Sequence, residues 1–180
     1  MALLFVMSRT APKAGLKIKL SDIPFGIGAF LLALPFVILA GDAAVALYRE
    51  LYKESPSPIA HPTLELILAN KSNQWAILLA ITAVIGSPLL EEILYRGFLQ
   101  SALLRFLNGQ VWLAIIGSAT LFTLVHRLGQ PPVPWHALLP IFTLGLSMGI
   151  AYERTKRLGV PIAMHVCFNA MNVALAWSQT

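Results

Sequence analysis

Residues 23–48 read IPFGIGAFLLALPFVILAGDAAVALY, and Asp42 is the only charged residue in this stretch. A helix that crosses the hydrocarbon core of a bilayer needs about 20 predominantly apolar residues, so this stretch is long enough to span it. The whole 180-residue chain has the same character, because 57% of its residues are hydrophobic and only 12% are charged. Soluble domains carry about 25% charged residues, so the sequence predicts a protein whose surroundings are largely lipid.

Four further apolar stretches follow, at residues 75–107, 111–128, 137–152 and 160–177. At a rise of 1.5 Å per residue, the first of these would be about 50 Å long, which is too long for one straight span. We expect a bend or break at Gly86-Ser87-Pro88, because proline removes a backbone donor. The sequence therefore predicts an all-α, polytopic membrane bundle of five to six transmembrane helices. A short helix is expected at residues 64–68, in the loop after the first span.

The basic residues predict an orientation. With a cytoplasmic N-terminus and five alternating spans, the 13 Lys and Arg residues divide nine to four in favour of the cytoplasmic side. This division follows the positive-inside rule. We therefore expect an integral protein of a bacterial-type cell membrane with its N-terminus in the cytoplasm.

Composition excludes two other classes of protein. The single cysteine, Cys167, cannot form a disulfide framework within one chain. The net charge is only +5 and the basic residues are scattered between apolar runs, so we expect no nucleic-acid partner. The expected partners are the lipid bilayer and a membrane-associated substrate.

Three groups of polar residues lie within the apolar stretches, where ionisable side chains are costly and are functional candidates by default. They are Glu91-Glu92 with Arg96, then His126, and then His165 with Asn169. Glu92 and Arg96 are four residues apart on one helix face and can neutralise each other. Glu91 lies about 100° further round the helix without such a partner, which suits a general base.

Each group also has an ordinary structural interpretation. The two glutamates can mark a charged helix end, and a lone His126 is more often an interior hydrogen-bonding residue than a catalyst. His165 and Asn169, four residues apart, can either hydrogen-bond a neighbouring helix or stabilise a developing oxyanion. Taken together in one small bundle, the three groups favour a site. We interpret His61 and His136 as interfacial.

These groups resemble the three-motif signature of the CAAX-processing and bacteriocin-processing intramembrane proteases. This family is also called Abi or type II CAAX protease, and it is related to the Rce-type endopeptidases. The matching motifs are Glu91-Glu92-x-x-x-Arg96, Phe122-x-x-x-His126 and His165-x-x-x-Asn169. The resemblance covers residues 75–176 and implies a helical, membrane-embedded peptidase.

The resemblance also implies a role for each motif residue. Glu91 would activate a water molecule that His126 helps to hold, and His165 with Asn169 would form the oxyanion site. The supporting residues would be Glu92, Arg96 and Phe122. The family has been described both as glutamic-type and as metal-dependent, and Glu, His and His are an acceptable ligand set for zinc. We expect no cofactor, with zinc on Glu91, His126 and His165 as the alternative.

The expected organisation has three regions. Residues 1–22 form a basic cytoplasmic segment, residues 23–74 an extra transmembrane helix and loop, and residues 75–177 the intramembrane protease core. The expected function is endoproteolysis of a membrane-associated substrate. Two alternatives use the same helical core: a non-catalytic membrane scaffold or assembly factor, and a proton-coupled transporter subunit with Glu and His as its relay.

The positions of His126 and His165 along their helices do not fit a simple bundle of five antiparallel spans. His126 lies near the far end of its helix, whereas His165 lies only about 8 Å after the start of its own helix. Both must approach Glu91 if they form one site. Helix tilt, a shortened fourth span or a break at Pro88 can reconcile the two depths, and the sequence does not choose among them.

Overall fold

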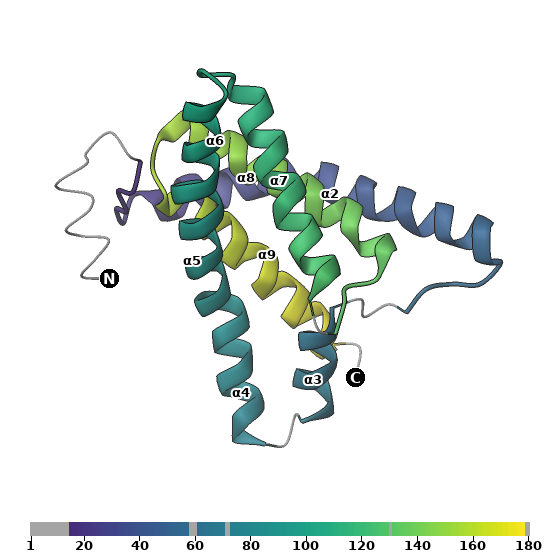
Figure 1. The fold of residues 1–180 in the computed structure, drawn as a ribbon. Helices are drawn as coiled ribbons and strands as arrows, with labels where there is room; N and C mark the ends of the chain where they lie inside the picture. The colour runs from purple at the N-terminus through teal and green to yellow at the C-terminus, as the bar shows by residue number, and fades with distance from the viewer. Residues whose placement is uncertain (1–14, 58–60, 71–72, 130, 179–180) are drawn as a thin grey trace.

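The computed structural model describes residues 15–57, 61–70, 73–129 and 131–178, and their regular structure is helical throughout (Figure 1). Five helical stretches in these residues are long and apolar enough to cross a membrane. They are Asp22–Tyr52, Gln74–Phe106, Val111–Leu128, Trp135–Thr155 and Gly159–Ser178. The predicted all-α membrane bundle is therefore confirmed, with five spans.

The first span is α2 (Asp22–Tyr52), and the short helix α3 (Pro62–Ala69) follows it. The second span is one column of five segments: α4 (Gln74–Ile81), the π-helical η2 (Thr82–Gly86), α5 (Ser87–Glu92), the π-helical η3 (Ile93–Gln100) and α6 (Ser101–Phe106). The remaining spans are α7 (Val111–Leu128), the 3-10 turn η4 (Trp135–Ala137) with α8 (Leu138–Thr155), and α9 (Gly159–Ser178). The predicted spans and the loop helix are present, with ends that differ by a few residues.

The expected break at Pro88 takes the form of a change in helical register. The helix continues through this position, and η2 directly precedes it. In η2 the Ser87 N–H donates to the carbonyl of Thr82, five residues earlier. A π-helical turn accommodates proline without ending the helix, because the wider register redistributes the backbone bonds around the missing donor.

The hairpin between α6 and α7 brings Glu91 and His126 to one level. Asn108 and Gly109 adopt left-handed conformations in the tight turn, with φ of 51° and 84°. Glu91 lies 15 residues before the end of α6 (106 − 91), and His126 lies 15 residues after the start of α7 (126 − 111). Two antiparallel helices joined by a short turn therefore place these residues opposite each other.

The corner between α8 and α9 lies beside the start of α6. The Tyr152 hydroxyl, near the end of α8, lies 3.2 Å from Ser101 Oγ at the start of α6. The fourth span is not shortened, because it ends at Thr155, beyond the expected residue 152. His165 nevertheless reaches the second span, where its Nδ1 lies 2.9 Å from Glu92 Oε1.

The beginning of α2 is tied to this corner. The buried Asp22 carboxylate pairs with Arg157, and the Leu158 N–H donates to the Lys17 carbonyl over 3.0 Å. The main core cluster lies between α2, α7, α8 and α9 and comprises Phe30, Ala33, Val37, Phe122, Val133, Ile141, Leu144, Met148 and Met164. Large apolar side chains on the outer face of α2 are exposed, as lipid contact requires: Leu31, Leu32, Phe36 and Leu39.

Close packing of α2 against α9 gives a test of the fold. A Cβ atom added at Gly26 would lie 2.4 Å from the Ala163 Cβ and 2.7 Å from the Val160 carbonyl oxygen. We expect Gly26→Ala to destabilise the bundle by about 1–3 kcal/mol, because backbone must move to relieve the overlap. The measurement is the midpoint of thermal unfolding in dodecyl maltoside.

Gly28 is the matched control in the same helix, because an added Cβ there meets nothing within 4 Å. Gly28→Ala should leave the midpoint unchanged or raise it slightly, since alanine favours the helix. Equal effects of the two substitutions would contradict the packing of α2 on α9.

Candidate active site

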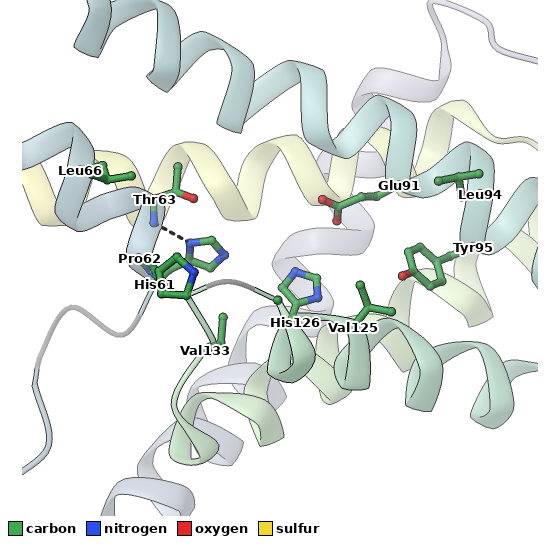
Figure 2. Close-up of a pocket in the computed structure, with 12 residues that line it drawn as sticks. His61, Pro62, Thr63, Leu66, Glu91, Leu94, Tyr95, Val125, His126 and Val133 are labelled. Atoms are coloured by element: carbon green, nitrogen blue, oxygen red, sulfur yellow. Dashed lines mark hydrogen bonds between the residues drawn. The ribbon is translucent and has the colours of Figure 1, made fainter.

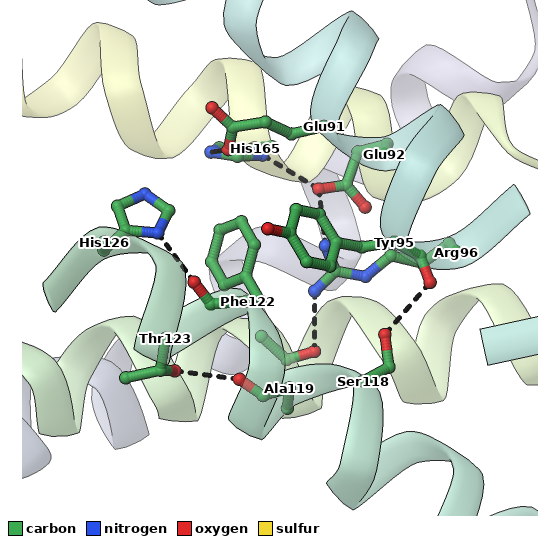
Figure 3. Close-up of polar contacts among 11 residues, drawn as sticks. Glu91, Glu92, Tyr95, Arg96, Ser118, Ala119, Phe122, Thr123, His126 and His165 are labelled. Atoms are coloured by element: carbon green, nitrogen blue, oxygen red, sulfur yellow. Dashed lines mark hydrogen bonds and ion pairs between the residues drawn. The ribbon is translucent and has the colours of Figure 1, made fainter. Parts of the chain in front are cut away.

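Glu92 and Arg96 form the buried centre of the site (Figure 3). The Arg96 Nη1 donates to Glu92 Oε1 over 2.8 Å, and both side chains are fully buried. This confirms the ion pair predicted from their spacing. The same glutamate oxygen accepts a second hydrogen bond, 2.9 Å long, from His165 Nδ1. One carboxylate therefore joins the second span to α9 and fixes the orientation of the His165 ring.

Arg96 extends this centre to α7 and α8. Its Nη2 donates to the Gly145 carbonyl over 3.0 Å, and its Cζ lies 4.9 Å from the centre of the Phe122 ring. The buried Phe122 ring also lies 4.6 Å from the His126 ring and 5.8 Å from the His165 ring, between centroids. Phe122 is thus the common packing surface for both histidines.

Glu91 has different surroundings from its neighbour. Its side chain is 27% exposed, and its Oε2 lies 3.8 Å from His165 Nε2, which is beyond hydrogen-bonding distance. Within the described part of the chain, this buried oxygen has no hydrogen-bond partner, and the same is true of Glu92 Oε2. Glu91 differs from Glu92 because it lines two cavities. Of the two adjacent carboxylates, one is neutralised in the core and the other remains available at a cavity.

His126 makes an interior hydrogen bond and also lines both cavities. Its Nδ1 lies 2.8 Å from the Phe122 carbonyl oxygen, which only accepts hydrogen bonds, so we assign the hydrogen to Nδ1. This bond is the interior contact expected of a structural histidine. It leaves Nε2 of the neutral ring as an acceptor, and His126 lines two cavities together with Glu91.

Asn169 stabilises the irregular part of the second span. Its Nδ2 donates to the Ala83 carbonyl over 2.8 Å. In a π-helical register this carbonyl would pair with the N–H of residue 88, which is proline, so the side-chain amide replaces the missing donor. A second amide hydrogen remains, and Asn169 lines the larger cavity with His165.

Two adjoining cavities share Glu91 and His126. The larger, about 740 Å³, is lined by residues of α2, the second span, α7, α8 and α9. The smaller, about 460 Å³, extends between α3, the second span and the end of α7, where Leu94, Tyr95 and Val125 line it (Figure 2). Both volumes are in the range of ligand pockets, about 300–1,000 Å³, and their walls are mainly apolar.

His61 lines both cavities, although the sequence indicates only an interfacial position for it. Its ring centroid lies 6.2 Å from that of His126, and its Nδ1 accepts a 3.2 Å hydrogen bond from the Thr63 N–H. Burial lowers the pKa of the His61 imidazole below its ordinary value of 6.5, and the nearby His126 lowers it further. The pattern His61-Pro62 predicts the start of a helix, because proline is favoured in the first turn. It does not predict that His61 lies beside the two cavities.

The other residues singled out in the sequence have simpler positions. Cys167 is half-buried against the main core cluster. Asp42 is exposed and lines the larger cavity. His136 is buried beside Tyr48, with 5.1 Å between ring centroids, and it lies at the beginning of the fourth span.

The arrangement does not assemble the alternative zinc ligands. Among the described residues, no three His, Cys, Asp or Glu side chains lie together in a way that could hold a metal ion.

Comparisons with known proteins identify relatives. The chain is 33% identical over 149 residues to the UPF0177 protein YbdJ of Lactococcus lactis. This alignment covers 81% of this chain and 61% of the relative. It is 32% identical over 98 residues to the membrane-embedded CAAX protease MroQ of Staphylococcus aureus. That alignment covers 54% of this chain and 38% of MroQ. The chain thus spans less than two thirds of the length of these relatives. No solved structure shows significant similarity.

Residues 73–171 match the family described as type II CAAX prenyl endopeptidase Rce1-like. This segment covers more than half of the chain and contains every motif residue: Glu91, Glu92, Arg96, Phe122, His126, His165 and Asn169. The chain therefore belongs to the Rce1-like family of type II CAAX proteases.

Proposed function

We propose that this protein is an intramembrane endopeptidase that hydrolyses a peptide bond of a membrane-associated substrate with a water molecule activated by Glu91. The observation that carries the proposal is the position of the Glu91 carboxylate. It lies at the junction of two cavities, beside His165 and opposite His126, and its Oε2 has no hydrogen-bond partner among the described residues. A general base needs such a free carboxylate within reach of the proton that it removes.

The hydrogen bonds support complementary roles for the surrounding groups. His126 Nε2, an acceptor in the neutral ring, can hold a hydrogen of the attacking water while Glu91 accepts its proton. The water oxygen then bonds to the carbonyl carbon of the substrate, and the carbonyl oxygen gains negative charge. Asn169 retains one amide hydrogen for this oxyanion after its bond to Ala83.

His165 is held by Glu92 as the histidine of a catalytic triad is held by its aspartate. Its Nδ1–H donates to the buried carboxylate, which leaves Nε2 directed towards Glu91. In this orientation Glu91 can pass the proton that it took from the water to His165 Nε2, and Glu92 stabilises the imidazolium that results. The imidazolium can stabilise the oxyanion. When the carbonyl re-forms and the C–N bond breaks, the Nε2 proton passes to the leaving amine, and this step completes hydrolysis.

The substrate class follows from the surroundings of the site. The cavity walls are mainly apolar and lie among five membrane-spanning helices, so a membrane-associated peptide or protein is the best fitting substrate. The named function of MroQ as a membrane-embedded CAAX protease agrees with this class. We further infer that the chemistry needs no metal, and that the protein lies in a bacterial-type cell membrane with a cytoplasmic N-terminus.

The two adjacent glutamates allow activity to be separated from stability. Glu91→Gln should reduce cleavage of peptides from a membrane-peptide library by about 10²–10⁴-fold, the usual contribution of a general base. It should leave the thermal midpoint in detergent nearly unchanged, because the charged contact of Glu91 among the described residues is His165 Nε2 at 3.8 Å, beyond hydrogen-bonding distance. Glu92→Gln should abolish cleavage and also lower the midpoint, because it leaves Arg96 as an unpaired buried charge at a cost of about 3–5 kcal/mol.

Glu65→Gln is the control, because Glu65 is exposed on α3. It should change neither measurement. A fully active Glu91→Gln protein would refute the proposed mechanism.

Metal dependence has a direct test. We expect the cleavage rate of the same peptide to persist after dialysis against a strong chelator, and added zinc to bring no increase. This expectation follows from the absence of a three-ligand cluster among the described His, Cys, Asp and Glu side chains. Loss of cleavage on chelation and its recovery with zinc would show that the metal-dependent alternative is correct.

The orientation can be tested by labelling cysteines from outside the cell. In a Cys167→Ser background, Lys53→Cys after α2 should react with a membrane-impermeant maleimide in intact cells. Arg154→Cys at the end of α8 should react only after the membrane is opened. Both side chains are exposed in the bundle, so access depends on the side of the membrane. The reverse pattern would place the N-terminus outside the cytoplasm.

A further inference from the structure

A third histidine reaches the candidate site from outside the segment that matches the family. His61 precedes the matched residues 73–171 and lies at the start of α3. It lines the same two cavities as Glu91 and His126. The family match therefore says nothing about this residue, and its position comes from the fold of the preceding region.

The hydrogen bonds of His61 define what its free nitrogen can do. Nδ1 accepts from the Thr63 N–H, so in this arrangement the ring hydrogen is on Nε2. Figure 2 shows this second nitrogen directed to the side of His126 and Glu91, away from Thr63. The His61 and His126 rings meet edge to face, with 73° between their planes and 6.2 Å between their centroids.

His61 supplies a donor beside two groups that accept. Glu91 offers carboxylate oxygens, and the free nitrogen of neutral His126 is an acceptor. A peptide bond presents both a donor and an acceptor, so its carbonyl needs a donor from the site. The Nε2–H of His61 is such a donor on the side of α3, in addition to the hydroxyl of Tyr95 and the second amide hydrogen of Asn169.

We propose that His61 is a substrate-binding residue of the active site, whose Nε2–H donates a hydrogen bond to a backbone carbonyl of the peptide substrate. In this arrangement α3 is a wall of the site, and the region before the family segment takes part in holding the substrate. This inference rests on the proposed peptidase function.

The helix cap allows the binding role to be separated from folding. His61→Asn keeps the cap, because asparagine is a favoured N-cap residue and its side-chain oxygen can accept from the Thr63 N–H. It removes the imidazole. We expect kcat/KM for a library peptide cleaved by the wild type to fall about tenfold through a higher KM, as the loss of one hydrogen bond predicts, with an unchanged thermal midpoint. His61→Ala should show the same loss of kcat/KM and, in addition, a lower midpoint.

Asn73→Ala is the matched control for loss of a cap. Asn73 caps α4 in the same way, since its Oδ1 accepts from the Trp75 N–H over 3.0 Å, but it lines neither cavity. This variant should lower the midpoint and leave kcat/KM unchanged. A His61→Asn protein with wild-type kcat/KM would overturn the role of His61 while the proposed function stands. A wild-type protein that cleaves no peptide would overturn both.

A second measurement tests the position of His61 without any substrate. In a Cys167→Ser background, the pair His61→Cys and His126→Cys should be joined by a short bifunctional methanethiosulfonate. The pair Asn70→Cys and His126→Cys should not, because Asn70 lies at the other end of α3. Failure of the first pair to cross-link would overturn the proposal, because His61 would not face the site.

Discussion

The bundle depends on one buried carboxylate. Glu92 Oε1 accepts hydrogen bonds of 2.8 Å from Arg96 and 2.9 Å from His165, and all three side chains are buried. Removing one partner of a buried pair is strongly destabilising, and the bilayer interior offers no water to compensate. Because Arg96 also bonds to α8 and lies over Phe122 of α7, this single negative charge links the second span to all three helices that follow it.

The burial of Glu92 also determines the direction of the Glu91 side chain. Neighbouring residues on a helix point about 100° apart, so a Glu92 directed into the core requires Glu91 to point elsewhere. Here Glu91 points to the junction of the cavities, where its carboxylate stays free of the ion pair. Arg96 donates from Nη1 to Glu92 and from Nη2 to the Gly145 carbonyl, and the described contacts include no bond from Arg96 to Glu91. If Glu91 is the general base as proposed, structural and chemical tasks are divided between two identical side chains.

Much of this arrangement could be predicted from the sequence, for identifiable reasons. Length and apolar composition determine the spans, and a four-residue spacing determines the Glu92–Arg96 pair. The remaining features depend on contacts between distant residues. The bond between Asn169 and Ala83 spans 86 residues, and the contact between Tyr152 and Ser101 spans 51. His61 lies in a connection without periodicity, so no pattern in the sequence related it to the motifs.

The site is divided between two regions of the chain. The residues with proposed chemical roles all lie in the family segment, 73–171, whereas α2 and α3 supply other walls of the cavities, including Val37, Asp42 and His61. A wall made by a preceding helix can change its side chains without disturbing the Glu92 ion pair, because none of the hydrogen bonds of that pair involves α2 or α3. If Glu91 activates water as proposed, bond cleavage and the choice of substrate are therefore controlled by different parts of the chain. On this argument, substitutions in residues 23–70 should alter which peptides are cleaved more readily than whether cleavage occurs.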